Sequence, residues 1–223
     1  MIINNSYFKG DIYIAHAKPG ITDSVTGVTL DINSFIDSYE NEALMKCLGY
    51  SLSREFIAVL NSEKSNGLIV GADSKWDDLL NGKEYTDPNG VLVKWEGIRR
   101  KTTTSTKYDK SFLADYVFFF YEQNEEIVRG GTGFGKPKAK NMRMTTSTPK
   151  VVKAWNRFVE LVQGTDQKPN VVQKYGIPIG IDWYGGGQQI TLYKFINDMN
   201  SIAPDTYAKF NPKSWKTMNQ FGI

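Results

Sequence analysis

The residues with the clearest chemical potential form a glycine-rich run, residues 130–136, that nearly matches a phosphate-binding loop. Such a loop needs a Ser or Thr after its lysine to reach magnesium, and it must lie between a strand and a helix. Here Pro137 follows Lys136, and proline has no N–H to offer a phosphate. The residues before the run have a long helical pattern, so neither nucleotide binding nor the similar dinucleotide fingerprint is predicted.

The other reactive side chains are too few or too scattered to build a catalytic centre. His16 is the only histidine and Cys47 the only cysteine, so zinc ligation and a catalytic Ser-His-Asp or Cys-His group lack members. The adjacent carboxylates at 77–78 and 125–126 would diverge by about 100° on a helix and could not share a site. We therefore expect no enzymatic activity, no cofactor and no metal.

The composition is aromatic and nearly neutral. The chain has 223 residues, a net charge of +3, 12 Phe, 12 Tyr and 5 Trp. This composition fits a partner-binding surface or a single aromatic core. One cysteine cannot form an internal disulfide, which indicates a reducing compartment. We find no signal-peptide pattern, and the longest apolar run, residues 116–121, is too short for a membrane span, so we expect a soluble protein made in the cytoplasm.

Positive charge is concentrated in one stretch of the chain. Between Val128 and Arg157 there is no acidic residue, and the eight basic ones are Arg129, Lys136, Lys138, Lys140, Arg143, Lys150, Lys153 and Arg157. The segment 31–63 is acidic by contrast. This asymmetry indicates contact with a polyanion or an acidic protein surface, although a solvated basic face would have the same composition.

Apolar side chains at three- and four-residue spacing predict the helices that would position these groups. We expect one helix over residues 31–48, ended by Gly49, and a second over residues 52–60. The short link between them predicts an antiparallel helical hairpin. Further helices are expected over residues 74–80, 148–164 and 192–202.

The central helix, expected over residues 107–127, is apolar around almost its whole circumference. A helix of this kind must be enclosed by protein on every side. Because a chain of this length has few elements to enclose it, we expect a neighbouring subunit to cover part of it. The side chains predicted to make this subunit packing are Phe112, Tyr116, Phe119 and Phe120.

The two ends of the chain have the patterns of extended arms. Residues 1–25 form the first arm, in which residues 11–15 alternate as a half-buried strand does. Residues 165–223 form a C-terminal extended interaction segment. It ends in aromatic residues without a helical or strand period, which suggests anchoring on another surface through Tyr207, Phe210, Trp215 and Phe221.

The predicted fold is mainly α: a small helical bundle with a short β-hairpin and extended N- and C-terminal arms. The helical domain covers residues 26–164. It includes a hairpin at about residues 84–97, where a turn separates two strand-like runs, and the basic glycine-rich loop, residues 130–147.

Several segments, taken in order, have residue patterns similar to those of a known family. They are residues 6–11 (SYFKGD), residues 35–40 (FIDSYE) with Leu48-Gly49, residues 112–124 with the loop that follows to Asn141, and residues 150–161. Together they resemble the connector or ring proteins of tailed bacteriophages, especially the crAss-like gut phages. The resemblance spans most of residues 6–162 and includes no catalytic signature.

This resemblance implies a connector-adaptor-like helical domain that assembles into a cyclic ring, dodecameric like the portal beneath which it lies. The implied role is structural: the ring joins the portal to the tail in the neck of the virion and lets DNA pass during ejection. Its implied partners are further copies of itself, the portal, other neck or tail ring proteins and, transiently, phage DNA, with no membrane. The protein would be made in the host cytoplasm and end in the virion.

Two uses of the basic stretch stay open. The loop residues expected to contact the portal, an adjacent ring or DNA are Arg129, Lys136, Lys138, Lys140 and Arg143. Docking on protein is favoured, because a strongly positive lumen would hold DNA phosphates and slow their passage. The alternative function is a nucleic-acid-binding module that uses residues 129–157. Only Phe134 and Trp155 there can stack on bases, and Trp155 belongs to a predicted buried stripe.

Overall fold

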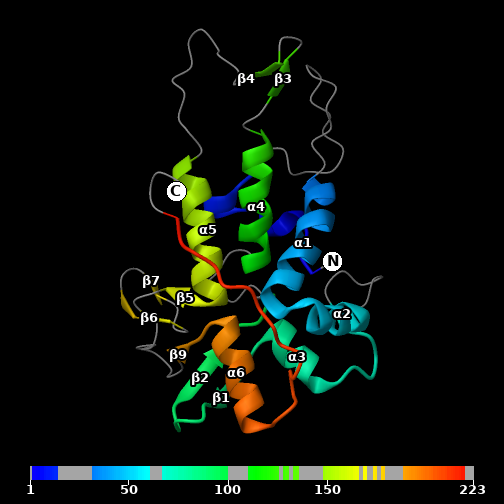
Figure 1. Ribbon diagram of the computed structural model, residues 1–223, viewed down its shortest axis with the longest axis vertical. Coiled ribbons are helices and arrows are strands. Elements are labelled where there is room, and N and C mark those ends of the chain that lie inside the picture. Colours follow the sequence, from blue (N-terminus) through cyan, green and yellow to red (C-terminus); the bar gives the residue numbers. More distant parts are fainter. Residues whose placement is uncertain are drawn as a thin grey trace.

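Figure 1 shows the computed structural model of the chain, a mainly helical fold with a small β-sheet at one end. The predicted class, a helical bundle with a short β-hairpin, is confirmed. The structure describes residues 2–14, 32–60, 67–99, 110–125, 128–130, 133–135, 148–165, 168–169, 173–174, 177–178 and 188–218.

Three helices form the larger part of the fold. They are α1 (Ile32–Leu48), α4 (Phe112–Glu125) and α5 (Thr148–Val162). In Figure 1, α4 lies between the other two, and it contacts both along its length. The apolar spacing of α1 and α5 places one stripe of each helix against α4, as the sequence predicts.

The middle helix, α4, has no water-facing side over most of its length. Ser111 caps its start: the Ser111 hydroxyl accepts a hydrogen bond from the Leu113 N–H at 3.2 Å and donates one to the Ile98 carbonyl at 2.7 Å. Every side chain from 111 to 119 is buried. The predicted enclosure is therefore confirmed, but the chain itself supplies the cover.

The helix α2 (Tyr50–Val59) follows α1 after one residue, Gly49. Gly49 has a left-handed φ of +86°, and a Cβ at this position would lie 2.7 Å from the backbone oxygen of Asn211, so only glycine fits. Figure 1 shows α2 running across the foot of α1 rather than back along it. The predicted antiparallel hairpin is wrong, because a link of one residue is too short to reverse the chain.

A second, smaller group of elements packs below the three-helix bundle (Figure 1). The predicted hairpin is confirmed, since β1 and β2 pair antiparallel with Tyr85 opposite Val93. A third strand, β9, pairs parallel to β2 from far along the chain. The members of this group are α3 (Ser74–Asn81), β1 (Lys83–Thr86), β2 (Leu92–Trp95), β9 (Gln188–Gln189) and α6 (Leu192–Ile202).

Six further strands are very short and pair two by two, each pair antiparallel. The first pair lies in the glycine-rich run, which therefore forms part of a hairpin beyond the end of α4 (Figure 1). The strands are β3 (Val128–Gly130), β4 (Gly133–Gly135), β5 (Gly164–Thr165), β6 (Lys168–Pro169), β7 (Gln173–Lys174) and β8 (Ile177–Pro178).

The N-terminal segment is not a free arm over its described residues, 2–14. Two single-turn 3₁₀ helices, Asn5–Tyr7 and Gly10–Ile12, take the place of the predicted strand. The alternation that suggested a strand does mark burial, because Ile12 and Ile14 are both buried. A strand also needs a neighbouring strand to pair with, and none is paired with residues 2–14.

A buried carboxylate holds the beginning of this segment. The side chain of Glu40, on α1, accepts hydrogen bonds from the N–H groups of Ile2, at 2.9 and 3.0 Å, and of Ile3, at 3.0 Å. Burial raises the pKa of Glu40, and these backbone donors oppose the rise by favouring the charged form. The first apolar residues are thereby fixed against α1 and complete its cover.

The region after residue 165 is also part of the folded body over much of its length. Leu192, Phe195 and Ile196 of α6 are fully buried. The ring of Phe195 stacks on Trp95 of β2 at 5.5 Å. The predicted division of the chain at residue 165 is therefore wrong, because α6 and β9 close the same core as the hairpin.

Removing one aromatic ring from α4 tests whether this helix is the centre of the fold. Phe119 is 4% exposed, so Phe119→Ala should lower the free energy of unfolding by about 3–5 kcal/mol, through lost burial and the cavity left behind. Tyr50, on α2, is 65% exposed, and Tyr50→Ala should change stability by less than about 0.5 kcal/mol. Urea unfolding of both variants measures the difference; equal stabilities would contradict the central role of α4.

Candidate functional site

The described C-terminal residues lie along the surface of their own chain. We call residues 203–206 the elbow and residues 207–218 the strap. Figure 1 shows the strap passing from α6 across α1 to α5. Along this path, the N–H of Asn211 donates to the Leu48 carbonyl at 3.2 Å and that of Lys213 to the Lys46 carbonyl at 2.9 Å. These carbonyls are in the last turn of α1, so the strap caps that helix.

Two amide side chains, Asn156 on α5 and Gln163 directly after the end of α5, bind the backbone of the strap. Gln163 accepts a hydrogen bond from the Trp215 N–H at 2.8 Å and donates to the Trp215 carbonyl. Asn156 does the same for Met218, at 2.7 and 2.8 Å. Each amide therefore satisfies both polar groups of one strap residue, as a neighbouring β-strand would. Seven residues separate the two amides, about two helical turns, and the Gln163 N–H still donates to the Val159 carbonyl at 2.9 Å, so Gln163 extends the same side of α5 on which Asn156 lies.

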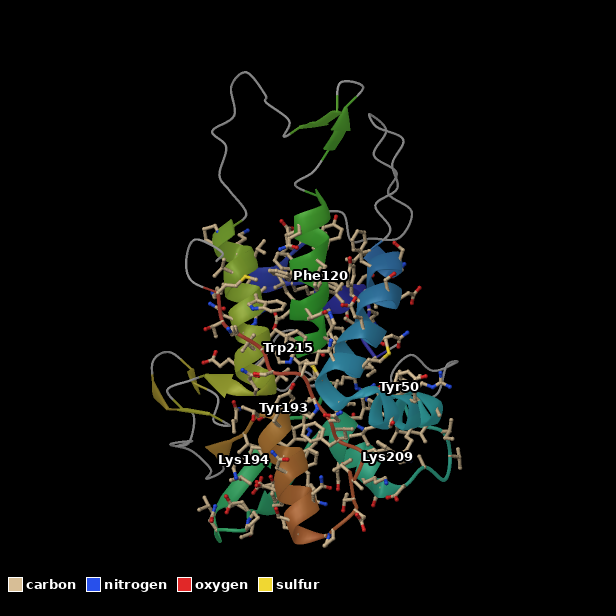
Figure 2. All side chains as sticks on the ribbon, in the orientation of Figure 1. Tyr50, Phe120, Tyr193, Lys194, Lys209 and Trp215 are labelled. Atoms are coloured by element: carbon tan, nitrogen blue, oxygen red, sulfur yellow. The ribbon has the colours of Figure 1, made fainter. Side chains whose placement is uncertain are left out.

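The ring of Trp215 fills an aromatic cleft between α4 and α5. Its centroid lies 4.9 Å from that of Phe158, 5.7 Å from that of Trp155 and 6.0 Å from that of Tyr116. Its indole N–H donates to the hydroxyl of Tyr193 at 3.0 Å, and this hydroxyl donates to the Lys213 carbonyl at 2.5 Å. In Figure 2, the labelled side chain of Trp215 lies on the strap and that of Tyr193, on α6, lies close to it.

The aromatic residues predicted to anchor an arm on another molecule lie on this chain instead. The hydroxyl of Tyr207 donates to the Lys75 carbonyl at 2.6 Å, and the Tyr207 side chain is 1% exposed. Phe210 packs edge-on against Tyr193 at 5.5 Å, and Trp215 fills the cleft. The prediction of an arm docked elsewhere is therefore wrong for these three residues. Phe221 lies outside the described residues.

The side chains predicted to pack against another subunit are enclosed within the chain. Phe112, Tyr116 and Phe119 are at most 4% exposed. Phe120 is half-buried and stacks on Tyr39 of α1, with ring centroids 4.5 Å apart and planes 4° apart. The sequence prediction underestimated how much cover one chain provides, because it treated both terminal segments as arms that leave the domain.

The predicted basic contact residues fall mostly beyond what the structure describes. Arg129 lies in β3, opposite Phe134 of β4 in the backbone register. The others, Lys136, Lys138, Lys140 and Arg143, lie outside the described residues. The structure therefore leaves the proposed contacts of this loop as predictions.

On α5, two basic residues of the same stretch are paired with acids. Lys153 lies 2.9 Å from a carboxylate oxygen of Asp11. Arg157 donates to the buried Asp115 through Nε at 2.8 Å and through a second nitrogen, and it lies 3.5 Å from Asp11. Burial raises the pKa of Asp115, and Arg157 opposes that rise. This part of the basic stretch thus carries less free charge than its sequence suggests.

A pocket of about 110 Å³ lies beside this ion pair. Its walls come from the N-terminal segment, β2, the start of α4 and α5, and they include Tyr7, Trp95 and Phe112. The charged residues of the lining are Lys9, Glu96, Lys110, Asp115 and Arg157. Arg157 is bound to Asp115, so part of this charge is already satisfied within the chain.

A network of titratable groups joins α6 to the hairpin. The ammonium of Lys194 lies 2.8 Å from Asp198 and 3.1 Å from Asp87, and the hydroxyl of Tyr85 donates to Asp198 at 2.8 Å. Burial alone would lower the pKa of Lys194, but the two carboxylates raise it overall. A lysine held charged cannot act as a nucleophile or base, so this network links elements rather than performing chemistry.

Of the single cysteine and the single histidine considered from the sequence, the structure describes only Cys47. Cys47 is fully buried, which raises the pKa of its thiol and keeps it protonated. Both His16 and Lys136 lie outside the described residues. Within the part of the chain that the structure describes, no three His, Cys, Asp or Glu side chains are placed to hold a metal ion. Nor is any described helix long and apolar enough to span a membrane.

Sequence reasoning missed the residues that matter most in this region, Asn156 and Gln163. Asn156 lies on the polar side of α5 and Gln163 just after its end, where both look like ordinary solvent-facing amides. Their spacing of seven residues on one helix was the only available signal. This spacing indicates a pair of backbone-binding amides only when the strap is seen to run beside the two residues.

Acid should weaken the link between the hairpin and α6. The N–H of Val91 and the ammonium of Lys194 hold the pKa of Asp87 below its ordinary value. This carboxylate therefore stabilises the fold fully above the pKa it has when unfolded, and the contribution is lost as pH falls through the lower folded pKa. Asp87→Asn should cost stability at pH 7, and the gap from wild type should close below about pH 4. Urea unfolding across pH measures this gap; a gap independent of pH would contradict it.

Removing one amide clamp should loosen the strap locally. In Gln163→Ala, the Trp215 N–H loses its partner, and its hydrogen exchange should speed up about tenfold, as expected for one hydrogen bond worth about 1–1.5 kcal/mol. Gln123→Ala is the matched control, because Gln123 is an exposed helical glutamine on α4. Exchange at residues 213–218 should be unchanged in the control, and equal rates in both variants would show that the clamp does not hold the strap.

Comparison with known proteins gives no match to this chain. No family model, no curated protein and no solved structure matches the chain. The function is therefore inferred from the residues of the chain, their arrangement and the resemblance described from the sequence.

Proposed function

We propose that the chain is a non-enzymatic structural subunit of a ring in the neck of a tailed-phage particle, where it joins the portal to the tail and lets DNA pass. One observation carries the proposal. The segments that resemble the ring proteins of crAss-like phages, residues 35–40, 112–124 and 150–161, lie on α1, α4 and α5. Because α4 packs against both other helices, the resemblance covers one physical unit rather than scattered pieces.

The chemistry of the described residues supports a scaffold. The Lys194 network and the Asp115–Arg157 pair are each closed by internal partners. The thiol of Cys47 is buried and protonated. A protein whose task is to hold a shape uses its polar groups in this way, whereas a catalytic centre keeps a reactive group open to substrate.

The proposed partners are other copies of the chain in a cyclic, dodecameric ring, the portal, adjacent neck or tail rings and, transiently, DNA. The hairpin β3–β4 lies beyond the end of α4, away from the second group of elements (Figure 1). In a ring, a basic loop in this region would repeat around the axis and form a positive collar. We assign this collar to docking on an acidic protein face, because tight attraction for DNA would slow its passage.

The alternative, a nucleic-acid-binding module built on residues 129–157, has less support. Lys153 and Arg157 already face Asp11 and Asp115. Trp155, one of two aromatic residues in that stretch, packs against Phe119 at 4.6 Å and so is not free to stack on bases.

The proposal is tested by assembly with the portal. The purified chain, mixed with portal of the same phage, should appear as an added ring in electron micrographs and co-sediment with it. Changing the four basic loop residues to alanine should abolish attachment while leaving the melting temperature unchanged. These residues are Lys136, Lys138, Lys140 and Arg143.

A matched control variant tests whether loss of attachment comes from the loop residues or from loss of positive charge anywhere on the chain. It removes the same number of positive charges elsewhere, by changing Lys94, Lys209, Lys213 and Lys216 to alanine. The control should still bind the portal. A chain that adds no ring to the portal would contradict the proposed function, and salt-sensitive binding to DNA without portal binding would favour the nucleic-acid module instead.

A further inference from the structure

The strap is bound in a way that does not depend on its connection to α6. Its main contacts are made by backbone groups: Asn211 and Lys213 donate to carbonyls of α1, and the amide clamps Gln163 and Asn156 hold Trp215 and Met218. The indole N–H of Trp155 also donates to the Lys216 carbonyl at 2.8 Å. A groove that binds an extended backbone in this manner accepts the same segment from any copy of the chain.

The elbow that returns the strap to its own chain is exposed and under strain. All residues from 201 to 205 are exposed. The Thr206 N–H donates to the Ala203 carbonyl at 3.2 Å, which closes a tight turn around Pro204 and Asp205. Asp205 has a φ of +71°, and it is the only described residue other than glycine with a positive φ. A turn with proline followed by a left-handed residue favours glycine there; aspartate tolerates a left-handed φ better than most side chains, but at a higher energy than glycine.

We propose that the strap is exchanged between copies: the elbow opens, and residues 207–218 of one chain occupy the groove of a second copy formed by α1, α5 and α6. The contacts within the groove are the same in both arrangements. Only the elbow differs, and opening it releases the strained backbone of Asp205. The occupant is the strap of an identical chain, because that is the segment already seated in the groove.

The balance between the two arrangements follows from concentration. A strap bound to its own chain has an effective concentration on the order of millimolar, which favours the monomer in dilute solution. When copies are held side by side, the local concentration of neighbouring straps is comparable, and relief of the elbow tips the balance toward exchange. Because residues 207–218 lie in the groove in both arrangements, only the elbow spans the gap between copies; fully extended it reaches roughly 15 Å, so exchange requires the end of α6 in one copy to lie close to the groove of the next.

An exposed ion pair offers a direct readout with unmodified chains. Lys209, on the strap, pairs with Glu55 on α2, and both side chains are solvent-accessible. A carbodiimide joins such a pair by an amide bond between the ammonium nitrogen and the carboxyl carbon, with loss of water taken up by the reagent. Equal amounts of ¹⁴N- and ¹⁵N-labelled full-length chain are refolded together at high concentration, treated with carbodiimide, separated by size and digested for mass spectrometry.

The oligomer fraction should contain cross-linked Lys209–Glu55 peptides of mixed isotope, and the monomer fraction only peptides of a single isotope. Two substitutions at the elbow then shift the balance in opposite directions. Asp205→Gly suits the left-handed turn and should raise the concentration needed for half-oligomerisation several-fold. Asp205→Pro cannot adopt a positive φ and extends the elbow, so it should lower that concentration at least tenfold.

Each outcome decides the matter. Single-isotope cross-links in the oligomer fraction, a chain that stays monomeric at every concentration, or an Asp205→Pro variant that remains monomeric with wild-type circular dichroism would each overturn the exchange. If Asp205→Pro does not fold, the isotope experiment on the wild-type chain still gives the answer. The exchange experiment uses only this chain and no portal. A negative result there would not contradict the neck-ring proposal, and a failure to bind the portal would not contradict the exchange.

Discussion

The fold depends on one constraint: α4 is apolar around almost its whole circumference, so most of its surface must be kept from water. Two flanking helices cannot close a cylinder alone. The N-terminal segment, fixed to Glu40 by the N–H groups of Ile2 and Ile3, covers further surface of the bundle. The strap closes the cleft between α4 and α5 by placing Trp215 against Tyr116 and Phe158. Both ends of the chain are therefore needed by the helix in its middle.

Burying α4 on most sides also buries some charged side chains, and several of these are paired with oppositely charged side chains of the same chain. Arg157 reaches Asp115, which stands on the buried surface of α4, and Lys194 lies between two carboxylates. A buried carboxylate left without a partner costs several kcal/mol, so such pairs preserve the fold more than they add to it.

The same dependence bears on assembly. A strap that covers an essential cleft, yet is bound through its backbone, can be supplied by either of two chains without changing the core. Neighbouring subunits of a ring could thus be joined through a segment that each needs for its own stability. The surface of the closed monomer then need not contain a large apolar patch for the copies to associate.

The sequence alone determined the order of the helices, their approximate extents and the hairpin, although α4 begins at Phe112 rather than at residue 107 and α2 begins at Tyr50 rather than at residue 52. Local signals decide these features: apolar spacing on α5 and α6, Gly49 after α1, and the turn between β1 and β2. It also determined that α4 must be enclosed. The regions outside the described residues, among them most of the basic loop, stay as sequence predictions.

Only the tertiary structure decided what encloses α4. An aromatic residue in an irregular segment has the same pattern whether it docks on its own chain or on another, so Trp215 and Tyr207 could not be assigned from sequence. Asn156 and Gln163 looked like surface amides for the same reason, because a hydrogen bond to a distant backbone leaves no local periodicity. The physical cause is that contacts between residues far apart in the chain depend on how the segments are arranged in space. The spacing of residues along the sequence carries no information about that arrangement.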